Sequence, residues 1–388
     1  MTSSKQTLST EQKKALLKKL RSNTPIKDFK VLNKPTTALS SATIINIPIF
    51  SNTLSKITLS QIKKIFENNT IMVNHYSSEK GDIGLFCIPY FLEDLSTKNF
   101  ELTRYINKLI PKIEILGAKS ITLAGNLSSA TGYLKSIKTA SKIISTGHAT
   151  TVASVILTLD AIIKRKSIDM NKATICFLGM GSIGQASFDA FTELNYGAKE
   201  IIISDTKVLK NLLSSIKAKH KHGNKIRISI AEEATHNLIY KADIIIAATN
   251  TPNSIDITKL KPGAVILDDS SPHCFSTLKA LNRMKSKKDI IACEAGMIET
   301  PYPIFDKHVA KETLGFIYEF LPGIFTSRSH NEMTSCILSG LLSSHGSIPF
   351  TVGSVKLKDS LKNISFLKEN NFSVSKLKLE GNLIDSIL

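Results

Sequence analysis

A glycine motif between a strand and a helix carries the clearest chemistry in this sequence. Residues 174–178 are typical of a short buried strand, and they run directly into Gly179, Gly181 and Gly184, spaced as G-x-G-x-x-G. An amphipathic run over residues 185–194 follows at once and predicts a helix. Glycines with this spacing permit a tight turn and let a pyrophosphate approach the N–H groups at a helix N-terminus. The motif therefore predicts a dinucleotide-binding site, the alternative being a glycine-rich turn that binds nothing.

Asp205 bears on which dinucleotide the site would prefer. It ends the next apolar strand, predicted over residues 200–204. A carboxylate there accepts hydrogen bonds from a ribose 2′-OH and repels a 2′-phosphate, which favours NADH. Lys207 could instead bind a 2′-phosphate, so NADPH is the alternative. Polar residues after a later strand, 244–248, are also expected over the cofactor. The predicted cofactor-binding residues are Gly179, Gly181, Ser182, Ile183, Gly184, Asp205, Thr249 and Asn250.

A cysteine near the start of a probable helix supplies a candidate nucleophile, Cys336. A helix N-terminus lowers the pKa of a thiol and so makes the thiolate available. A thiolate beside a nicotinamide suits attack on an acyl group, formation of a thioester and then reduction. The alternative for Cys336 is a packed core position, which is also what we expect for Cys87 and Cys176. Cys274 and Cys293 follow sheet strands and are the second and third candidates.

His148 is the second candidate catalytic residue. It lies in the hydroxyl-rich segment 145–151, at the start of a long apolar helix predicted over residues 150–164. The hydroxyls could cap that helix, whereas His148 could face a cleft between domains, where substrate meets the nicotinamide. Asp268 and Asp269 end a later strand at the same sheet edge. Either could contact a substrate or a metal ion, or simply form a turn.

The elements that must hold these residues alternate between strand and helix. This alternation predicts an α/β fold with a doubly wound parallel sheet of Rossmann type, preceded by a mixed α/β domain. The predicted strands and helices of the sheet domain are 174–178, 185–194, 200–204, 207–218, 226–230, 243–248, 264–268 and 290–293. Residues 24–50 read as turn-rich and partly extended, and residues 309–345 as helical. The predicted units are a basic amphipathic helix that could dock on a partner (1–23), a substrate domain (24–150), a Rossmann domain (151–305) and a C-terminal helical part packing back on the first domain (306–388).

Composition narrows the class of protein. The 388 residues, 42% of them hydrophobic, suit two domains with proper cores. The five cysteines show no C-x-x-C pairing or zinc spacing, so we expect no metal and reduced thiols in a cytoplasmic enzyme. The apolar helix candidate at 152–163 is too short to span a bilayer, so no integral membrane association is expected. The net charge of +18 has two interpretations: lysines scattered over the surface, or attraction of an acidic protein partner. Nucleic-acid binding is not expected, because no basic run is interleaved with aromatic residues.

A series of motifs occurs in one order between about residues 70 and 345. They are Gly81–Leu95 with its Phe91-Leu92-Glu93-Asp94-Leu95 pattern, Leu116-Gly117-Ala118 leading to Ala124-Gly125, Thr146-Gly147 to Thr151, Gly179–Gly184, Val265–Asp268, Glu294-Ala295-Gly296, and Met333–Leu342 around Cys336. On these motifs the chain resembles the aldehyde-forming long-chain acyl-[acyl-carrier-protein] reductases best known from cyanobacteria. The resemblance implies a substrate domain, a central Rossmann domain and a returning C-terminal part, with Cys336 at the position of the family's catalytic cysteine.

The resemblance also implies an activity. It is reduction of an acyl thioester, carried by acyl carrier protein or coenzyme A, to an aldehyde with NADPH or NADH through an acyl-Cys336, in a lipid or secondary-metabolite pathway. The family uses NADPH and tends to carry a basic residue near the position of Asp205, and it often has Asn at the position of His148. Two alternatives stay open. One is a shikimate-type or amino-acid dehydrogenase acting on a small keto acid, which usually needs a Lys–Asp pair in the first domain. The other is a non-catalytic NAD-binding module.

Overall fold

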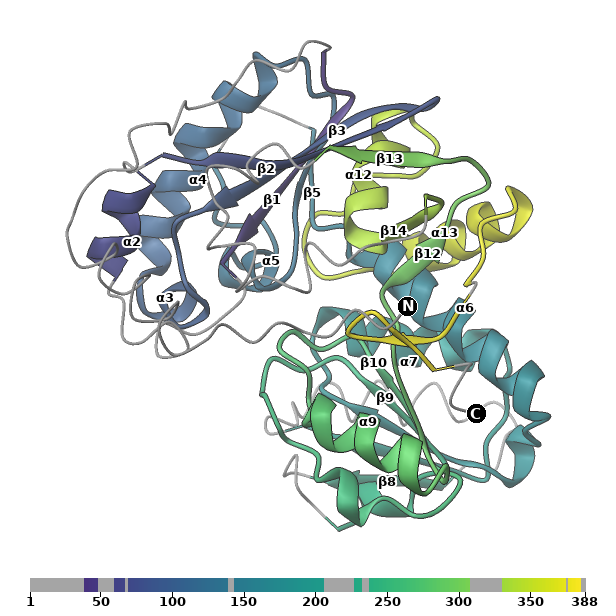
Figure 1. The fold of residues 1–388 in the computed structure, drawn as a ribbon. Coiled ribbons are helices and arrows are strands. Elements are labelled where there is room, and N and C mark those ends of the chain that lie inside the picture. The colour runs from purple at the N-terminus through teal and green to yellow at the C-terminus, as the bar shows by residue number, and fades with distance from the viewer. Residues whose placement is uncertain are drawn as a thin grey trace.

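Two six-stranded sheets form the body of the protein, one in each lobe of Figure 1. The computed structural model describes residues 38–47, 59–66, 69–138, 143–205, 227–231, 237–307, 330–374 and 376–384. The basic helix predicted within residues 1–23, the helix predicted at 207–218, Lys207 and residues 309–329 lie outside these ranges.

The first sheet contains both parallel and antiparallel strands and belongs to the α/β domain predicted before the Rossmann unit. Its strand order is β13-β2-β3-β1-β4-β5, in which β1, β3, β4 and β5 run parallel while β2 is antiparallel to both of its neighbours. The strands are β1 Ser41–Asn46, β2 Ile71–Ser78, β3 Gly81–Ile88, β4 Ile121–Leu123, β5 Ile144–Ser145 and β13 Ile304–Lys307. The stretch 24–50, predicted as turn-rich and partly extended, contains β1, a strand between two parallel partners.

Helices cover both faces of this first sheet. On one face α4 buries an apolar stripe that includes Leu102, Ile106 and Ile110, in one core with Ile44 of β1. The opposite face packs against α12, in a second core that contains Leu85. The helices of this lobe are α2 Leu59–Ile65, α3 Leu92–Thr97, α4 Asn99–Glu114, α5 Asn126–Ala130 and α12 Ser335–Ser344. The prediction that a C-terminal helix packs back on the first domain is confirmed by α12.

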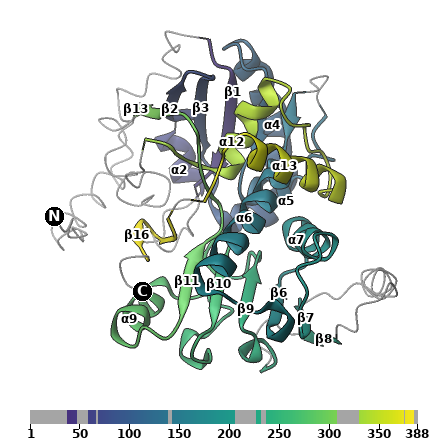
Figure 2. The same cartoon turned by 90° about the vertical axis from the view of Figure 1, so that its right-hand side faces the viewer.

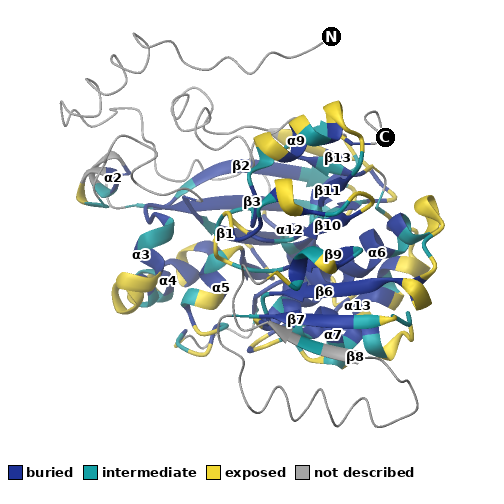
Figure 3. Cartoon of the chain, turned by 90° about the horizontal axis from the view of Figure 1, so that it is seen from below, coloured by how far each residue is buried: buried dark blue, intermediate teal, exposed yellow. Residues whose placement is uncertain are grey.

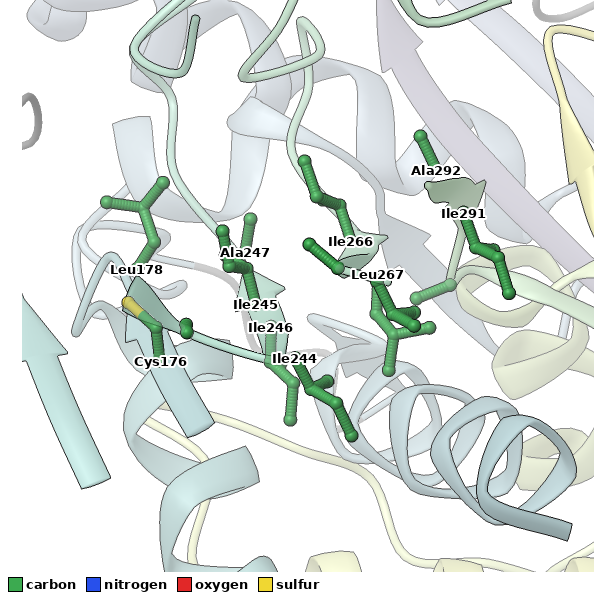
Figure 4. Packing of buried hydrophobic residues seen from close by; sticks show 14 of the residues in the cluster. Cys176, Leu178, Ile244, Ile245, Ile246, Ala247, Ile266, Leu267, Ile291 and Ala292 are labelled. Atoms are coloured by element: carbon green, nitrogen blue, oxygen red, sulfur yellow. The ribbon is translucent and has the colours of Figure 1, made fainter. Parts of the chain in front are cut away.

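The second sheet is entirely parallel and has the order β11-β10-β9-β6-β7-β8. This is the strand order of the Rossmann fold, so the predicted doubly wound sheet is confirmed. Its strands are β6 Thr174–Leu178, β7 Glu200–Ser204, β8 Arg227–Ala231, β9 Ile244–Ala247, β10 Val265–Asp268 and β11 Ile291–Glu294. The strands shown in Figure 4 are continuously apolar because both faces of the sheet are covered. Helices α7 Ser182–Glu193 and α9 Thr277–Ser286 contribute to this core.

Helix α6, His148–Lys166, lies between the two sheets (Figure 2). Val155 and Leu159 pack into the core of the second sheet, whereas Val152 and Ile156 belong to the core shared with α12. A helix that is covered on both sides must be apolar nearly all round, which explains why the sequence shows a long apolar run here. Because α6 is packed on both sides, its first residue has a fixed position between the lobes.

The C-terminal part contacts both lobes. Strand β14, Glu332–Thr334, pairs antiparallel with β12, Met297–Glu299, and leads straight into α12. The helical pattern predicted for residues 309–345 is therefore wrong at β14, because pairing with β12 overrides the local pattern. Helix α13, Leu357–Glu369, packs on α6 and α7, and the hairpin β15–β16 contacts β11. The hairpin strands are Lys378–Leu379 and Asn382–Leu383.

Burial follows this arrangement. In Figure 3 the strands of both sheets are largely buried, and exposed residues gather on the outer turns of helices such as α4 and α9. In the part of the chain that the structure describes, no helix combines the length and the apolar character needed to cross a membrane.

Candidate functional site

A cavity of about 580 Å³ lies between the two sheets. Its floor is made by residues that directly follow β6, β7, β9 and β10, so it occupies the crevice outside the carboxyl ends of the strands. Ligands of open parallel sheets bind in this position. The two first-choice catalytic residues, His148 and Cys336, line the cavity, and so do all the predicted cofactor-binding residues except Gly184. Those lining residues are His148, Gly179, Gly181, Ser182, Ile183, Asp205, Thr249, Asn250 and Cys336.

The glycine loop requires glycine at two positions for steric reasons. Gly179 has a φ of +84°, and a Cβ there would lie 2.6 Å from the carbonyl oxygen of Ala248. A Cβ on Gly184 would lie 1.8 Å from the carbonyl oxygen of Gly179. Gly184 thus contributes by letting α7 pack against the loop, which explains why it does not line the cavity. Gly181 caps α7, and a Cβ there would meet only the Tyr133 hydroxyl, at 3.8 Å.

Asp205 and Thr249 flank this loop. The backbone N–H of Met180 donates a hydrogen bond of 2.5 Å to Oδ2 of Asp205, which fixes the carboxylate beside the glycine loop. Thr249 follows β9, and its backbone N–H donates to Oγ of Ser270 at 3.0 Å. Both contacts join the ends of neighbouring strands, so the loop geometry is stabilised from two sides.

Cys336 lies in the first turn of α12, on the wall opposite the sheet. The residue before it, Ser335, donates its backbone N–H to the carbonyl oxygen of Gly296 at 2.8 Å, and its hydroxyl lies 3.1 Å from that of Thr151 on α6. A Cβ on Gly147 would lie 3.1 Å from Cα of Cys336. The start of α12 is therefore held against both α6 and the loop after β11.

The structure separates Cys336 from the other four cysteines, and all five lie in described parts of the chain. Cys336 is half-buried and lines the cavity, whereas Cys87, Cys176, Cys274 and Cys293 are fully buried and do not line it. Burial raises the pKa of Cys87 to about 12, and burial with the nearby Asp268 raises that of Cys274 well above its usual range. Cys274 and Cys293, the second and third nucleophile candidates, are thus core thiols outside the cavity.

His148 is the first residue of α6 and connects it to the glycine loop. Its Nδ1 lies 3.3 Å from Oγ of Ser182, the first residue of α7, and that oxygen also accepts the backbone N–H of Val355 at 3.0 Å. His148 is 7% exposed, and burial lowers its pKa to about 4. The imidazole is therefore neutral at pH 7, which suits a hydrogen-bonding role better than that of a charged acid.

This pKa predicts a pH dependence of stability. The unfolded chain protonates His148 near its ordinary value of 6.5, whereas the folded protein does so near 4. Because the unfolded state binds more protons between these values, the free energy of unfolding should fall by ~3 kcal/mol as the pH drops from 6.5 to 4. His148→Asn should remove this part of the pH dependence, which urea unfolding at several pH values measures. A variant as pH-sensitive as the parent would contradict the assignment.

Tyr133 is a lining residue that sequence reasoning missed. Its φ of 56° and the φ of 71° of Leu134 both lie in the left-handed region, which is strained for such side chains. Its backbone N–H donates to the carbonyl oxygen of Ser128, and its own carbonyl oxygen accepts from Gly353. The ring meets that of His148 edge to face, with 5.8 Å between centroids. No local pattern marks such a tyrosine, because its position depends on how the first lobe meets the glycine loop.

Three helix N-termini meet at the cavity. They are the starts of α6 at His148, of α7 at Ser182 and of α12 at Ser335, and all three residues line it. A helix N-terminus presents unpaired N–H groups and partial positive charge. No lysine or arginine lines the described part of the cavity. The helix termini therefore supply positive potential for a pyrophosphate, a thiolate or an oxyanion.

Comparisons with known proteins give distant likenesses. No protein-family model matches the chain, and no curated protein does. Among solved structures, L-tryptophan dehydrogenase from Nostoc punctiforme has a TM-score of 0.36 at 12% identity, over 87% of this chain and 91% of that one. Shikimate 5-dehydrogenase from Listeria monocytogenes, in complex with shikimate and NAD, has a TM-score of 0.32 at 10% identity, over 68% and 90%. A dipicolinate synthase chain from Bacillus halodurans has a TM-score of 0.32 at 12% identity, over 58% of this chain and 64% of that one. The match therefore spans less than two thirds of the length of the dipicolinate synthase chain.

Proposed function

We propose that this protein is an NAD(P)-dependent oxidoreductase that reduces an acyl thioester to an aldehyde, with Cys336 as the nucleophile. One observation carries the proposal: the half-buried thiol of Cys336 stands at a helix N-terminus in the same cavity as the glycine loop. A thiol and a dinucleotide site that share one cavity suit acyl transfer followed by reduction.

The residues of the second lobe fit a nicotinamide dinucleotide. The open space over Gly181 leaves room for a pyrophosphate at the N-terminus of α7, and Asp205 is placed to accept hydrogen bonds from a ribose 2′-OH. Thr249 and Asn250 would lie along the cofactor at the end of β9. When bound, NADH or NADPH supplies the hydride. The carboxylate of Asp205 favours NADH.

Residues of the protein have separate roles in the reaction. The thiolate of Cys336 attacks the thioester carbonyl, a new C–S bond forms, and the bond to the carrier's sulfur breaks. Backbone N–H groups in the first turn of α12 beyond Ser335, whose N–H bonds Gly296, would stabilise the oxyanion, because the first N–H groups of a helix point away from its own carbonyls. After reduction of the acyl carbon, Cys336 leaves as thiolate and the aldehyde is released. His148, neutral and bonded to Ser182, holds the glycine loop against α6.

The thioester would be carried by acyl carrier protein or by coenzyme A. Both carriers are acidic, and the net charge of +18 would steer either toward this protein. This electrostatic steering predicts rates that fall as ionic strength rises.

The cavity lining favours this function over the two alternatives. A shikimate-type or amino-acid dehydrogenase usually needs a Lys–Asp pair, and the described lining contains no lysine to form one. A non-catalytic module would have no need of an accessible thiol at a helix N-terminus beside the dinucleotide site.

Intact-protein mass spectrometry tests the proposal. The protein is mixed with a series of acyl-CoA thioesters, and then with acyl carrier protein thioesters, without nicotinamide. We expect one acyl adduct that maps to Cys336 and disappears when NADH or NADPH is added, with release of aldehyde. The chain length with the fastest adduct formation and the more effective nucleotide identify the substrate and the cofactor. If no thioester of either carrier gives an adduct, the proposal is wrong.

A further inference from the structure

Asp269 places a carboxyl group in the same cavity. It directly follows β10, its backbone N–H donates to the carbonyl oxygen of Ala247 at 2.8 Å, and its side chain lines the cavity. Its Oδ1 lies against Gly296, where a Cβ would be only 3.2 Å away. This contact places the carboxyl at the sheet edge nearest the loop after β11.

The contact with Gly296 also connects Asp269 to the nucleophile. The carbonyl oxygen of Gly296 accepts the backbone N–H of Ser335 at 2.8 Å, and Ser335 immediately precedes Cys336. Asp269 and Cys336 are thus separated by one glycine and one hydrogen bond, although they lie 67 positions apart in the sequence. Both side chains line the same cavity.

The neighbouring carboxylate has a different role. Asp268 is fully buried and accepts from the backbone N–H groups of Ser270 at 3.0 Å and Cys274 at 3.2 Å, and its Oδ2 lies 2.9 Å from Nδ1 of His273. These three contacts engage both oxygens of the Asp268 carboxylate and give it a structural role. In contrast, no described residue donates a hydrogen bond to the carboxyl of Asp269.

Burial and a neighbouring carboxylate both act on the pKa of Asp269. Burial raises its pKa well above the usual range, and the negative charge of Asp268 raises it further. The described titratable groups that line the cavity with Asp269 are Cys336, His148, Asp205 and Tyr133. On the side of Asp268 lie His273 and Cys274, and beyond them Glu294 and Glu380. The pKa of His273 is raised overall. Burial by itself lowers it, but the hydrogen bond to Asp268 and the carboxylates of Asp268, Glu294 and Glu380 outweigh that effect. His273 therefore interacts with Asp268 and not with Asp269. This environment favours the protonated form of the Asp269 carboxyl over its ionised form.

We infer that the carboxyl of Asp269 is the acid that protonates the departing thiol during formation of the acyl-enzyme. This inference rests on the proposed function. As the thiolate of Cys336 forms its bond to the acyl carbon, the carrier's C–S bond breaks and the sulfur takes the proton of Asp269. The Asp269 carboxylate then regains a proton from solvent. Per turnover, thioester, reduced nicotinamide and one proton give aldehyde, thiol and oxidised nicotinamide, so the atoms and electrons balance.

Leaving-group dependence tests this role in Asp269→Asn. With acyl-CoA, whose aliphatic thiol is basic, the variant should form the Cys336 adduct ~10²-fold more slowly, the lower range for loss of a general acid. With an aryl thioester of the same acyl group, whose thiolate leaves without a proton, parent and variant should react at similar rates. Asp256→Asn, an equal substitution at the N-cap of a short 3-10 helix outside the cavity, should leave both rates unchanged.

The pH profile gives a second readout. In the parent, adduct formation from acyl-CoA should slow at high pH as Asp269 loses its proton, and this alkaline decline should be absent from the variant. Equal slowing with both thioesters would mean that Asp269 only supports the cavity wall, and no slowing with either would exclude it as the acid. Both outcomes overturn the inference while the parent's adduct still supports the proposed function. A parent without any adduct overturns the proposed function itself.

Discussion

Cys336→Ala should abolish aldehyde formation, reducing turnover of the preferred acyl thioester by about 10⁴-fold or more, as loss of a nucleophile does in covalent catalysis. The reason is that no other thiol can replace it: the remaining four cysteines, all in described parts of the chain, are fully buried outside the cavity. Turnover is measured as nicotinamide oxidation together with aldehyde release. The nucleotide should still bind with unchanged affinity, because Cys336 belongs to α12 whereas the glycine loop belongs to the second sheet.

Cys293→Ala is the matched control for this experiment. Its thiol is fully buried and donates to the carbonyl oxygen of Ile266 at 3.6 Å, so its loss should lower stability slightly and leave turnover intact. A thiol reagent should likewise label the parent at Cys336 and leave the Cys336→Ala protein unlabelled. Aldehyde formation by Cys336→Ala at the parent's rate would remove the acyl-enzyme from the mechanism.

Two glycine substitutions should separate the folding of the loop from its binding of a cofactor. In Gly184→Ala the new methyl would collide with the backbone oxygen of Gly179, so α7 must shift. We expect the free energy of unfolding to fall by about 3 kcal/mol and nucleotide binding to be lost. In Gly181→Ala the methyl meets only the Tyr133 hydroxyl at 3.8 Å, so stability should change by about 1 kcal/mol or less.

The informative result is the affinity of Gly181→Ala. A methyl at this position would occupy the space that a pyrophosphate needs at the N-terminus of α7, so affinity should fall ~100-fold, equivalent to about 3 kcal/mol. Denaturant unfolding and calorimetric titration with NADH and NADPH measure the two quantities separately. A stable Gly181→Ala protein with the parent's nucleotide affinity would show that the pyrophosphate does not bind at this helix.

The second domain could be predicted closely because its signals are local. The strand at 174–178 was predicted with the bounds of β6, and the alternation that follows it predicted a parallel sheet, which the strand order confirms. A continuously apolar strand indicates that both of its faces are buried. The G-x-G-x-x-G motif indicates positions where a side chain would not fit, and these positions lie within a few residues of each other. Helix α7, by contrast, begins at Ser182 rather than at 185, because the motif's last residues form its first turn.

The first domain was harder to predict. Strand β1 sits between β3 and β4, yet its partners lie some forty and eighty positions away, and its flanking prolines suggest turns. Strand β14 reads as part of a helical pattern until it is paired with β12. In both cases the backbone hydrogen bonds that decide the structure come from distant segments, and local propensity does not report them.

By itself the sequence determined which residues could do chemistry: the glycine loop, Asp205, and a thiol at the start of a helix. Only the tertiary structure decided which of them meet. It brings Cys336, His148 and the loop to one cavity, buries the competing cysteines, and sets Tyr133 over Gly181. It also decides the direction of pKa shifts, since burial lowers the pKa of His148 to about 4 and raises the pKa of Asp269. The physical reason is that proximity and desolvation are properties of the packed chain: they arise from contacts between segments far apart in the sequence, which residue types and spacing do not encode locally.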